Sequence, residues 1–522
     1  MIETVDTDTI DVVEVIIVGA GPTGLMLAAE LGLAGVRPLV LERRRQPSNA
    51  ARAGGLGGHI LELLAYRGLL DRLEAAANPR HHPGLQYPFG TLHLDLTNVP
   101  EPPLRGLAIP QPKLERILDE RARELGAEVR RGHEVVGLSQ DDATVSADVR
   151  GPEGSYRVTG RFLVGCDGPR SRVRELAGIE FPGTTYSEVN RLGYVTLADS
   201  VTELDNGDLD VPGFGRIRPG FTRTERGVFA LGRRSSGDLM IQTTEAEPAE
   251  VDDDDAPMTL AEFQESLDRV LGAQLPIAEA TRLSRYGFQA RQAKGYRRGR
   301  VLLAGDAAHV FPATGVGLNV GMTDAVNLAW KLAADLRGWA PAGLLDTYHG
   351  ERHYAGARTM MQTEAQVALR RGQDAAAEAL RELLRELLAD EQPARRLGAL
   401  IAAADLRYPM PGADHHPLAG ISAPNLTLHT DQGTSSVAEL MHAARPVFLD
   451  LADRPDLREI VEPWHDRVDI RTAKADDRPA DALLIRPDAH IAWAAADDEP
   501  ADTAARGLRE ALSAWFGEPP RP

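Results

Sequence analysis

The sequence predicts an α/β fold built on a parallel sheet, and its N-terminal region carries the first support for this prediction. The apolar run at 15–18 leads into the glycine-rich turn GAGPTG at 19–24, and 25–34 has helical spacing. A second strand at 37–41 ends at Glu42. A strand, a glycine turn, a helix and a strand in this order form the first half of a Rossmann-like, dinucleotide-binding unit.

Two later strands also end on an aspartate beside glycine. The first is FLVGCDGPRS at 162–171, and the second is VLLAGD at 301–306. A loop that holds Pro312, Gly315 and Gly317 follows the second strand, and the run at 324–332 is then predicted to be a helix. We expect a flat, charged ligand beside these strand ends.

The glycines of the first turn have separate roles. Gly19 allows the tight turn, Gly21 lets the backbone approach a pyrophosphate, and Gly24 lets the helix pack close to the strand. The pyrophosphate then lies at the helix N-terminus, where free N–H groups and the helix dipole favour an anion. Glu42 can accept a hydrogen bond from a ribose hydroxyl. This context favours a dinucleotide site over an unrelated glycine-rich turn.

Composition limits the class of protein. A length of 522 residues suggests roughly two to four domains, and a net charge of −19 argues against nucleic-acid binding. Cys166 is the single cysteine, so we expect no disulfide and a reducing, cytoplasmic setting. The acidic N-terminal stretch does not resemble a secretory signal. No apolar run reaches the ~18–20 residues that a membrane span needs.

The middle of the chain predicts an inserted domain. Segment 80–105 is rich in proline, histidine and aromatic residues, and 186–285 is predicted to form strands and loops. We interpret the acidic run at 245–255 as a solvated loop. Helical stretches are predicted at 59–78, 113–125 and 353–403, and a small antiparallel layer of strands at 127–165.

The tail beyond the proline-rich linker is predicted to be a small, separate α/β domain. It contains no cysteine, which excludes a dithiol role and favours a structural or dimer-contact role. Strands are expected at 446–451, 468–471, 482–486 and 490–494, and a final helix at 504–515.

In their order and spacing, these motifs resemble the FAD-dependent aromatic hydroxylases, the single-component flavoprotein monooxygenases similar to para-hydroxybenzoate hydroxylase. The resemblance extends over nearly the whole chain and is strongest to bacterial hydroxylases of aromatic polyketides such as angucyclines, because the tail also matches. It implies a Rossmann-like FAD-binding domain (11–80, 106–185 and 286–352), an inserted β-sheet substrate domain (81–105, 186–285 and 353–403) and a thioredoxin-like C-terminal domain (415–522).

The resemblance also implies roles around FAD. Asp306 would bond the ribityl chain or a ribose, 315–319 would face the pyrimidine edge of the flavin, and Pro312 would lie near its reacting face. Arg52 resembles the family's flavin-phosphate arginine, and Gln111 its FAD-contacting glutamine. The full predicted set is Gly19, Gly21, Pro22, Thr23, Gly24, Glu42, Arg43, Arg52, Gln111, Asp167, Asp306, Pro312, Gly315, Gly317, Leu318 and Asn319.

Some positions depart from the family pattern. His59 stands where the family often has an arginine, the loop at 54–58 is unusually rich in glycine, and GVGL at 315–318 replaces the common Gly-Gln-Gly-Met. We expect these changes to affect flavin movement and substrate fit rather than FAD binding. The resemblance assigns Asp167 to contacts with both FAD and NADPH, and His309 is expected to be a structural, hydrogen-bonded histidine.

The implied reaction is hydroxylation of an electron-rich aromatic ring. NADPH, or NADH in its place, would reduce FAD, and dioxygen would give a flavin 4a-hydroperoxide that transfers an oxygen atom. The substrate pocket is expected between the flavin and the inserted domain, and the polyketide-type resemblance favours a large, polycyclic phenol. Candidate lining residues, each of which also suits a core position, are Tyr87, Phe89, Phe214, Phe229 and Met240.

Several alternatives stay open at this stage. The same flavin chemistry supports a Baeyer–Villiger insertion or an oxidative rearrangement, and the sequence does not separate these from hydroxylation. A flavin dehydrogenase or a flavin-bound sensor belongs to another class. A flavin halogenase is disfavoured because there is no Trp-x-Trp motif. We expect a small aromatic molecule as partner, no metal ion, no nucleic acid and no membrane, and a homodimer is the candidate oligomer.

Overall fold

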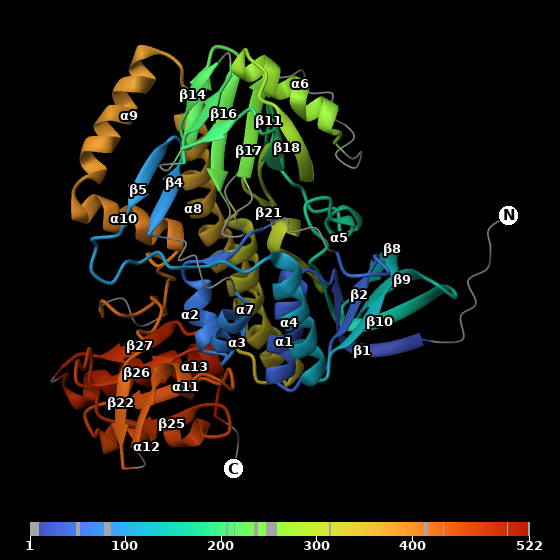
Figure 1. Ribbon diagram of the computed structural model, residues 1–522. Helices are drawn as coiled ribbons and strands as arrows, with labels where there is room; N and C mark the ends of the chain where they lie inside the picture. The colour runs from blue at the N-terminus through green and yellow to red at the C-terminus, as the bar shows by residue number, and fades with distance from the viewer. Residues whose placement is uncertain are drawn as a thin grey trace.

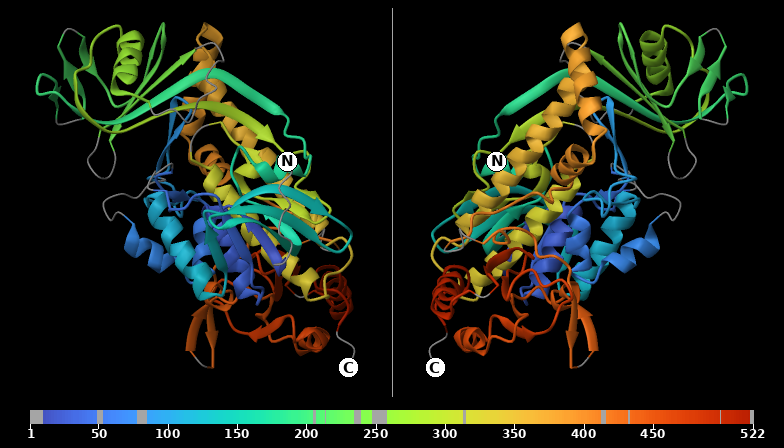
Figure 2. Two further views of the ribbon diagram at one scale, coloured as in Figure 1. Left: turned by 90° about the vertical axis from the view of Figure 1, so that its right-hand side faces the viewer. Right: turned by 90° about the vertical axis from the view of Figure 1, so that its left-hand side faces the viewer.

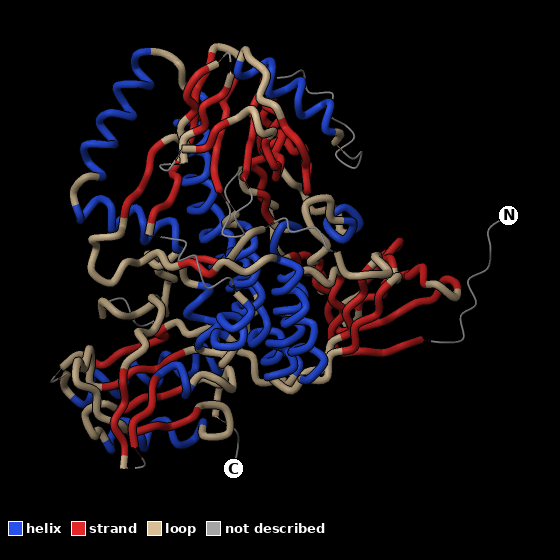
Figure 3. Tube along the Cα trace, viewed as in Figure 1, coloured by secondary structure: helices blue, strands red, loops and turns tan. Residues whose placement is uncertain are grey.

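The computed structural model describes most of the chain. The described residues are 10–48, 53–77, 85–204, 207–212, 214–233, 239–246, 258–312, 315–411, 416–431, 433–497 and 499–519. Within these ranges, no helix combines the length and the apolar character needed to cross a membrane. Helices fill the middle of the molecule, and sheets lie around them (Figure 3).

The first part of the fold is an eight-stranded sheet with parallel central strands. Its order is β19-β20-β10-β1-β2-β7, with β9 paired to β10 and β8 to β9. β1 is parallel to both β10 and β2, and β10 is parallel to β20. The strands are β1 (Ile10–Val18), β2 (Leu39–Glu42), β7 (Glu128–Arg131), β8 (Glu134–Gln140), β9 (Val145–Gly151), β10 (Gly154–Gly165), β19 (Arg297–Arg298) and β20 (Val301–Leu303).

The predicted antiparallel layer at 127–165 is only partly separate from this sheet. β8, β9 and β10 are antiparallel neighbours, as expected. However, β7 pairs in parallel with β2, and the end of β10 lies between β1 and β20. The layer is therefore an extension of the parallel sheet, because the long strand β10 belongs to both.

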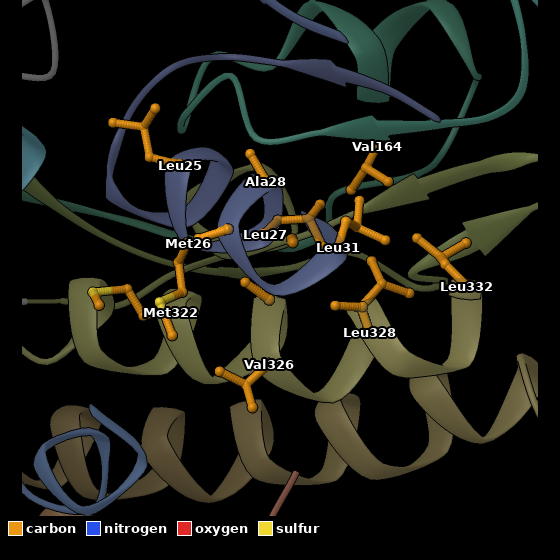
Figure 4. Close-up of a cluster of buried hydrophobic side chains, with 14 of the residues drawn as sticks. Leu25, Met26, Leu27, Ala28, Leu31, Val164, Met322, Val326, Leu328 and Leu332 are labelled. Atoms are coloured by element: carbon orange, nitrogen blue, oxygen red, sulfur yellow. The ribbon is translucent and has the colours of Figure 1, made fainter. Parts of the chain in front are cut away.

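Three helices lie beside this sheet: the first packs against both of the others, and Figure 4 shows its buried contact with the third. They are α1 (Pro22–Leu33), α4 (Gln111–Glu124) and α7 (Gly317–Leu336). Leu27 of α1, Val164 of β10 and Leu328 of α7 are fully buried in one core. Helix α7 also differs from the helix predicted at 324–332, because it begins seven residues earlier, within the glycine loop. The stretch at 59–78 forms two helices, α2 (Ile60–Ala65) and α3 (Leu70–Ala76), because Gly68 between them has a φ of +63°.

A six-stranded sheet stands at one end of the molecule (Figure 1), and its long strands β11 and β18 reach back toward the first sheet (Figure 2). Its order is β15-β16-β17-β11-β18-β21. The strands are β11 (Gly183–Leu197), β15 (Gly220–Thr224), β16 (Gly227–Arg233), β17 (Leu239–Ala246), β18 (Ile277–Gln292) and β21 (His309–Val310).

Different helices cover the two faces of this sheet. Helix α6 (Leu260–Leu271) packs on what we call the outer face, where Phe229, Ile241 and Phe263 form a core. Helix α8 (Asp346–Arg371) runs past the other side, the inner face, and contacts β18. Because side chains alternate along a strand, neighbouring residues of β17 point to opposite faces.

The acidic run at 245–255 does not begin as a solvated loop. Glu245 is the penultimate residue of β17 and is buried on the outer face. Its carboxylate pairs with Arg191 at 3.1 Å and with Arg269 at 2.9 Å. Two arginines on neighbouring elements thus draw the first acid of the run into the fold, while 247–257 lie outside the described residues.

The C-terminal part lies at the opposite end of the molecule from the six-stranded sheet (Figures 1 and 2). Its four-stranded sheet has the order β25-β24-β26-β27. Only the pair β24–β25 is parallel within it. Its elements are β22 (Thr427–Thr430), β23 (Gly433–Ser436), α11 (Val437–Leu440), β24 (Val447–Asp450), α12 (Pro455–Val461), β25 (Asp469–Thr472), β26 (Ala482–Ile485), β27 (Ile491–Ala495) and α13 (Ala501–Phe516).

Smaller elements link these parts. Helices α9 (Ala375–Leu388) and α10 (Glu391–Ala402) follow α8, in agreement with the helical prediction for 353–403. The remaining elements are β3 (Leu56–Gly57), β4 (Gln86–Phe89), β5 (Leu92–Asp95), β6 (Gly106–Leu107), α5 (Arg172–Leu176), β12 (Thr202–Glu203), β13 (Leu209–Val211) and β14 (Gly215–Ile217).

Candidate functional site

The first glycine turn has the shape of an anion cradle. A Cβ atom on Gly19 would lie 2.4 Å from the carbonyl oxygen of Cys166, and one on Gly24 would lie 2.0 Å from that of Gly19. Glycine is thus required at both positions. A Cβ on Gly21 would meet nothing within 4 Å, so the turn is open on that side. Gly21 precedes the first residue of α1 and offers no capping side chain, which leaves backbone N–H groups for a phosphate.

Thr23 brings the first and the third motif together. A Cβ on Gly305 would lie 2.6 Å from Thr23 Oγ1, and one on Gly321 of α7 would lie 2.5 Å from it. Gly305 also has a φ of +65°, which favours glycine. Helix α1, which begins with Pro22, is therefore held against the end of β20 and against α7.

The carboxylate of Glu42 faces the glycine turn. It accepts hydrogen bonds from the backbone N–H of Ala20 at 2.9 Å and from that of Arg44 at 2.8 Å. Arg43 next to it is exposed. The end of β2 and the glycine turn therefore lie together, while the contact of Glu42 with a ribose hydroxyl stays a prediction.

Gln111 orders the loop that follows β2. Its Oε1 accepts from the N–H of Ala53 at 3.1 Å, and its Nε2 donates to Glu115 at 2.8 Å. Arg52, the predicted flavin-phosphate residue, lies outside the described residues. Gln111 is thus bonded to Ala53, the residue that follows Arg52 in the sequence.

Asp167 has a structural use at the second motif. Ser171 Oγ donates to its Oδ1 at 2.5 Å, and the N–H of Val173 donates to its Oδ2 at 3.1 Å. Burial raises the pKa of Asp167, although these bonds act in the other direction. Both carboxylate oxygens therefore hold the first turn of α5, and the predicted contact with FAD and NADPH stays a prediction.

The third motif opens toward the start of α7. Asp306 is exposed, and a Cβ on Gly317 would lie 3.3 Å from its Oδ1. Gly315 has a φ of +77° and open space around it, while Pro312 precedes residues 313–314, which are not described. Asn319 Oδ1 accepts from the N–H of Gly57 at 3.2 Å, which ties the first turn of α7 to β3. Leu318 is partly buried against the core of this part.

A buried group of charged side chains, which no motif predicts, packs behind this third motif. Asp324 of α7 accepts from the N–H of Gly305 at 2.9 Å, from His309 Nε2 at 2.7 Å and from Arg352 Nε at 2.7 Å. Burial would raise the pKa of Asp324, but the charges of His309 and Arg352 hold it below its ordinary value. Arg352 also donates to Tyr408 Oη at 2.6 Å. His309 is thus hydrogen-bonded, as expected.

A second buried group of charges joins α7 and α8 to the C-terminal part. Arg486 donates to Glu351 Oε1 at 2.6 Å and also bonds Asp488. Lys331 Nζ lies 2.7 Å from the same glutamate, and Asn327 donates to Asp488 at 2.8 Å. Burial lowers the pKa of Lys331 to about 8, although Glu351 acts in the other direction. The signal in the sequence is a polar stripe along an apolar helix.

The inner face of the six-stranded sheet carries aromatic rings, and beside them lies an arginine that has no carboxylate partner among the described residues. Arg370, near the end of α8, lies 5.4 Å from the ring centre of Phe221 and 5.9 Å from that of Phe288. Within the described part of the chain its guanidinium forms no ion pair and donates one hydrogen bond, to Gly90 O at 3.5 Å, while its backbone carbonyl accepts one from Arg223. Burial lowers its pKa, with Tyr286 and Tyr87 acting in the other direction.

Amide and hydroxyl groups lie beside these rings. Gln242 Nε2 donates to Asn190 Oδ1 at 3.1 Å, and Thr244 Oγ1 donates to the same oxygen at 2.8 Å. Tyr286 Oη donates to Gln242 Oε1 at 3.2 Å, and burial raises the pKa of this tyrosine to about 12. The inner face therefore combines flat apolar surface with polar groups, as small-molecule sites do.

The five predicted substrate residues lie in different places. Phe229 is fully buried in the outer-face core, and Phe89 is buried in another core beside β5, so both predictions are corrected: these rings fill cores. Phe214 is exposed between β13 and β14. Met240 lies beside Gly232 on the inner face, and Tyr87 is partly buried near Arg370.

Comparison with known proteins covers nearly the whole chain. A family model described as an FAD binding domain matches residues 12–363, and one described as the C-terminal part of aromatic-ring hydroxylases matches 416–519. The first match spans both the eight-stranded and the six-stranded sheet, and the second spans the C-terminal part.

Named relatives align from end to end. A 12-dehydrotetracycline 5-monooxygenase/anhydrotetracycline 6-monooxygenase from Streptomyces rimosus is 42% identical over 97% of this chain and 99% of its own. A rifampicin monooxygenase from Streptomyces venezuelae is 37% identical over 97% of this chain and 98% of its own. The solved structure of OxyS anhydrotetracycline hydroxylase from Streptomyces rimosus superposes with a TM-score of 0.86 at 40% identity, covering 98% of this chain and 100% of that one.

Proposed function

The chain belongs to the FAD-dependent aromatic-ring hydroxylases, and from this membership we propose that it hydroxylates a large, polycyclic phenol of the polyketide type. It is an FAD-dependent monooxygenase of a class that uses a nicotinamide reductant and dioxygen. The nature of the substrate, the residues that hold each group and the cytoplasmic location stay predictions.

The residues present fit FAD. The open turn at Gly21 and the start of α1 would hold the pyrophosphate, and Glu42 would meet the adenosine ribose. Asp306 would bond the ribityl chain, and the N–H groups at 315–319 would face the pyrimidine edge. Bound FAD supplies hydride acceptance and oxygen activation. The chain's own task is then to orient the ring, exclude water and deliver protons.

One observation carries the substrate proposal: Arg370 is a partly buried cation between two aromatic rings, with no carboxylate partner in the described part of the chain. A buried charge without a partner is costly. The phenolate or enolate of a polycyclic phenol would supply the missing negative charge, and its fused rings would extend along Phe221 and Phe288.

The position of the inner face supports the same proposal. Strand β18 carries Tyr286 and Phe288 and continues to Gln292, which pairs with His309 just after the third motif. Phe288 lies four positions before Gln292, which is about 13 Å along the strand. The rings therefore lie within reach of a large substrate whose reacting carbon sits at the flavin.

The C-terminal part also receives a proposal. Its sheet has one parallel and two antiparallel pairs, with α12 and α13 packed together, which supports a thioredoxin-like fold. Its contacts to Glu351 and Asn327 favour a structural role within the chain. A homodimer stays a prediction.

The first experiment measures flavin content and substrate-dependent oxidation. We expect a yellow, FAD-loaded protein whose NADPH oxidation and dioxygen consumption accelerate several-fold with one polycyclic phenol. With isotopically labelled dioxygen, one labelled atom should appear in a new ring hydroxyl. Label within a ring ester would instead indicate Baeyer–Villiger insertion. NADPH oxidation without dioxygen consumption would indicate a dehydrogenase, and no oxidation with any phenol would favour a sensor.

Asp306→Ala tests the cofactor placement. Loss of a charged hydrogen bond is expected to weaken FAD binding about tenfold to hundredfold, so the variant should lose its yellow colour on dilution. Fluorescence titration with FAD measures the effect. Asp199→Ala, at an exposed turn of the distant sheet, is the matched control and should bind FAD normally. Unchanged affinity in Asp306→Ala would refute the ribityl contact.

A further inference from the structure

A small pocket lies beside the first turn of α7. Val316 and Asn319, in the loop and turn proposed to face the flavin, form one wall, and Gly57, Thr323 and Arg352 contribute others. Its volume of about 30 Å³ has room for about two water molecules. The pocket thus stands directly behind the proposed flavin contact.

His59 connects this pocket with the protein surface. Its side chain is only 5% exposed, and its Nδ1 lies 3.1 Å from Oε2 of Glu62, whose side chain is 57% exposed. The other ring nitrogen, Nε2, is buried and has no hydrogen-bond partner among the described residues. Because His59 lines the pocket, its unpartnered nitrogen is available to a water molecule held there.

We propose that His59 is a proton relay that passes protons from Glu62 to water in this pocket, and through it to the flavin site. The proposal rests on the proposed function, since hydroxylation consumes one proton: NADPH, dioxygen, a proton and the phenol give NADP⁺, water and the hydroxylated product. Imidazole can carry that proton, because one nitrogen can bind a proton while the other releases one.

Each transfer leaves the relay balanced. The exposed carboxylate of Glu62 first takes a proton from bulk water. Neutral His59 then donates the proton on Nε2 to pocket water as Nδ1 takes the new proton from Glu62, which leaves Glu62 a carboxylate again. The imidazole returns to its starting tautomer by ring rotation or by exchange with pocket water. No group other than the proton moves, so the relay needs no further reactant.

Ionisable groups surround His59. Glu62 lies at its Nδ1, Arg352 contributes to the pocket wall, and the ring centre of His490 is 6.0 Å away. Burial would raise the pKa of Glu62, but the hydrogen bond and charge of His59, together with Arg105, hold it below its ordinary value.

The test combines removal of the imidazole with its return. In His59→Ala, we expect normal FAD binding and about a hundredfold slower oxygen-dependent phase in single turnover. Free imidazole should restore the rate, with a pH dependence that follows the titration of the added imidazole. His133→Ala is the matched control. His133 is a partly buried histidine that is hydrogen-bonded to Tyr156 at the edge of the first sheet. The rate of the oxygen-dependent phase in His133→Ala should equal that of the wild type.

A second readout does not depend on turnover. NMR of the FAD-free protein, with the His59 signal assigned from its loss in His59→Gln, should show the Nδ1 signal of His59 change in Glu62→Gln, because the contact between Nδ1 and the carboxylate is lost. An unchanged rate in both His59 variants, or a slow rate that imidazole does not restore, would overturn the relay. A wild-type protein without FAD would instead overturn the proposed function, so the two failures are distinguishable.

Discussion

On the outer face of the six-stranded sheet the buried arginine has carboxylate partners, whereas on the inner face Arg370 has aromatic rings. Arg191 lies 3.1 Å from Glu245 and 3.0 Å from Glu262, and Arg269 completes the group. Arg370 has ring neighbours and no ion pair within the described residues. The two faces are built from the same sheet, whose strands present Glu245 on one face and Phe221 and Phe288 on the other, and a different helix covers each face.

This difference separates charges that hold the fold from charges that await a ligand. A buried ion pair with all its partners present is complete, and removing one partner leaves an uncompensated charge. A partly buried cation without a carboxylate partner is tolerated at a binding site, because the bound substrate can supply the missing negative charge. The comparison therefore predicts stability effects on the outer face and substrate effects on the inner face.

Glu245→Ala should give the largest effect. The substitution leaves Arg191 and Arg269 beside a cavity without their shared carboxylate, so the free energy of unfolding should fall by about 3–5 kcal/mol. Urea unfolding followed by circular dichroism measures this change. Tryptophan fluorescence is unsuitable, because the five tryptophans all lie at or after Trp330, outside the sheet.

The control is an exposed acid on the same sheet side, Glu265→Ala on α6, which should leave stability within about 0.5 kcal/mol. For molecules that remain folded, kcat/KM should be unchanged in Glu245→Ala. A variant as stable as the wild type would show that the outer-face ion group contributes nothing.

Glu245 also shows what the sequence cannot reveal. The glycine turns, the strand ends at Glu42 and Asp306 and the order of the parts were predictable, because they follow from local backbone requirements. Glu245 was misread as the start of a solvated loop, since its partners Arg191 and Arg269 are distant in sequence. A run of acids says nothing about which member has a partner.

The same reason explains the errors at the candidate substrate site. Aromatic residues suit a core and a pocket equally, so Phe229 and Phe89 could not be told from Phe221 and Phe288 without the register of the strands. Arg370 carried no motif at all. Its role is suggested only by what surrounds it in space.

Arg370→Met, on the inner face, should give the second-largest effect, and this effect should be on substrate binding. The variant keeps the length and apolar stem but removes the charge, so kcat/KM for the phenol should fall about tenfold to hundredfold. The fall should appear mainly in KM, because a charge that holds the substrate acts before and during reaction. Steady-state kinetics over a range of phenol concentrations measures it.

The free energy of unfolding shows whether Arg370 serves substrate binding or the fold. The free energy of unfolding of Arg370→Met should equal or exceed that of the wild type, since a partly buried cation without a carboxylate is removed. Arg370→Lys keeps the charge but loses the planar guanidinium, so its KM should lie between those of the wild type and Arg370→Met. A destabilised Arg370→Met with unchanged KM would make Arg370 a structural residue and end the contrast between the faces.

Two adjacent threonines of β17 give the smallest and most direct comparison. Thr243 Oγ1 lies 2.6 Å from Ser266 Oγ on the outer face, and Thr244 Oγ1 donates to Asn190 Oδ1 on the inner face. Valine replaces each with nearly the same shape. Thr243→Val should lower the free energy of unfolding by about 1 kcal/mol without changing KM, because one buried hydrogen bond is lost. Thr244→Val should instead raise KM by a few-fold with little change in unfolding, because it alters the polar group offered to substrate. Neighbouring residues with identical chemistry then differ only in the face to which they point, so equal effects from both variants would remove the distinction between a structural and a binding face.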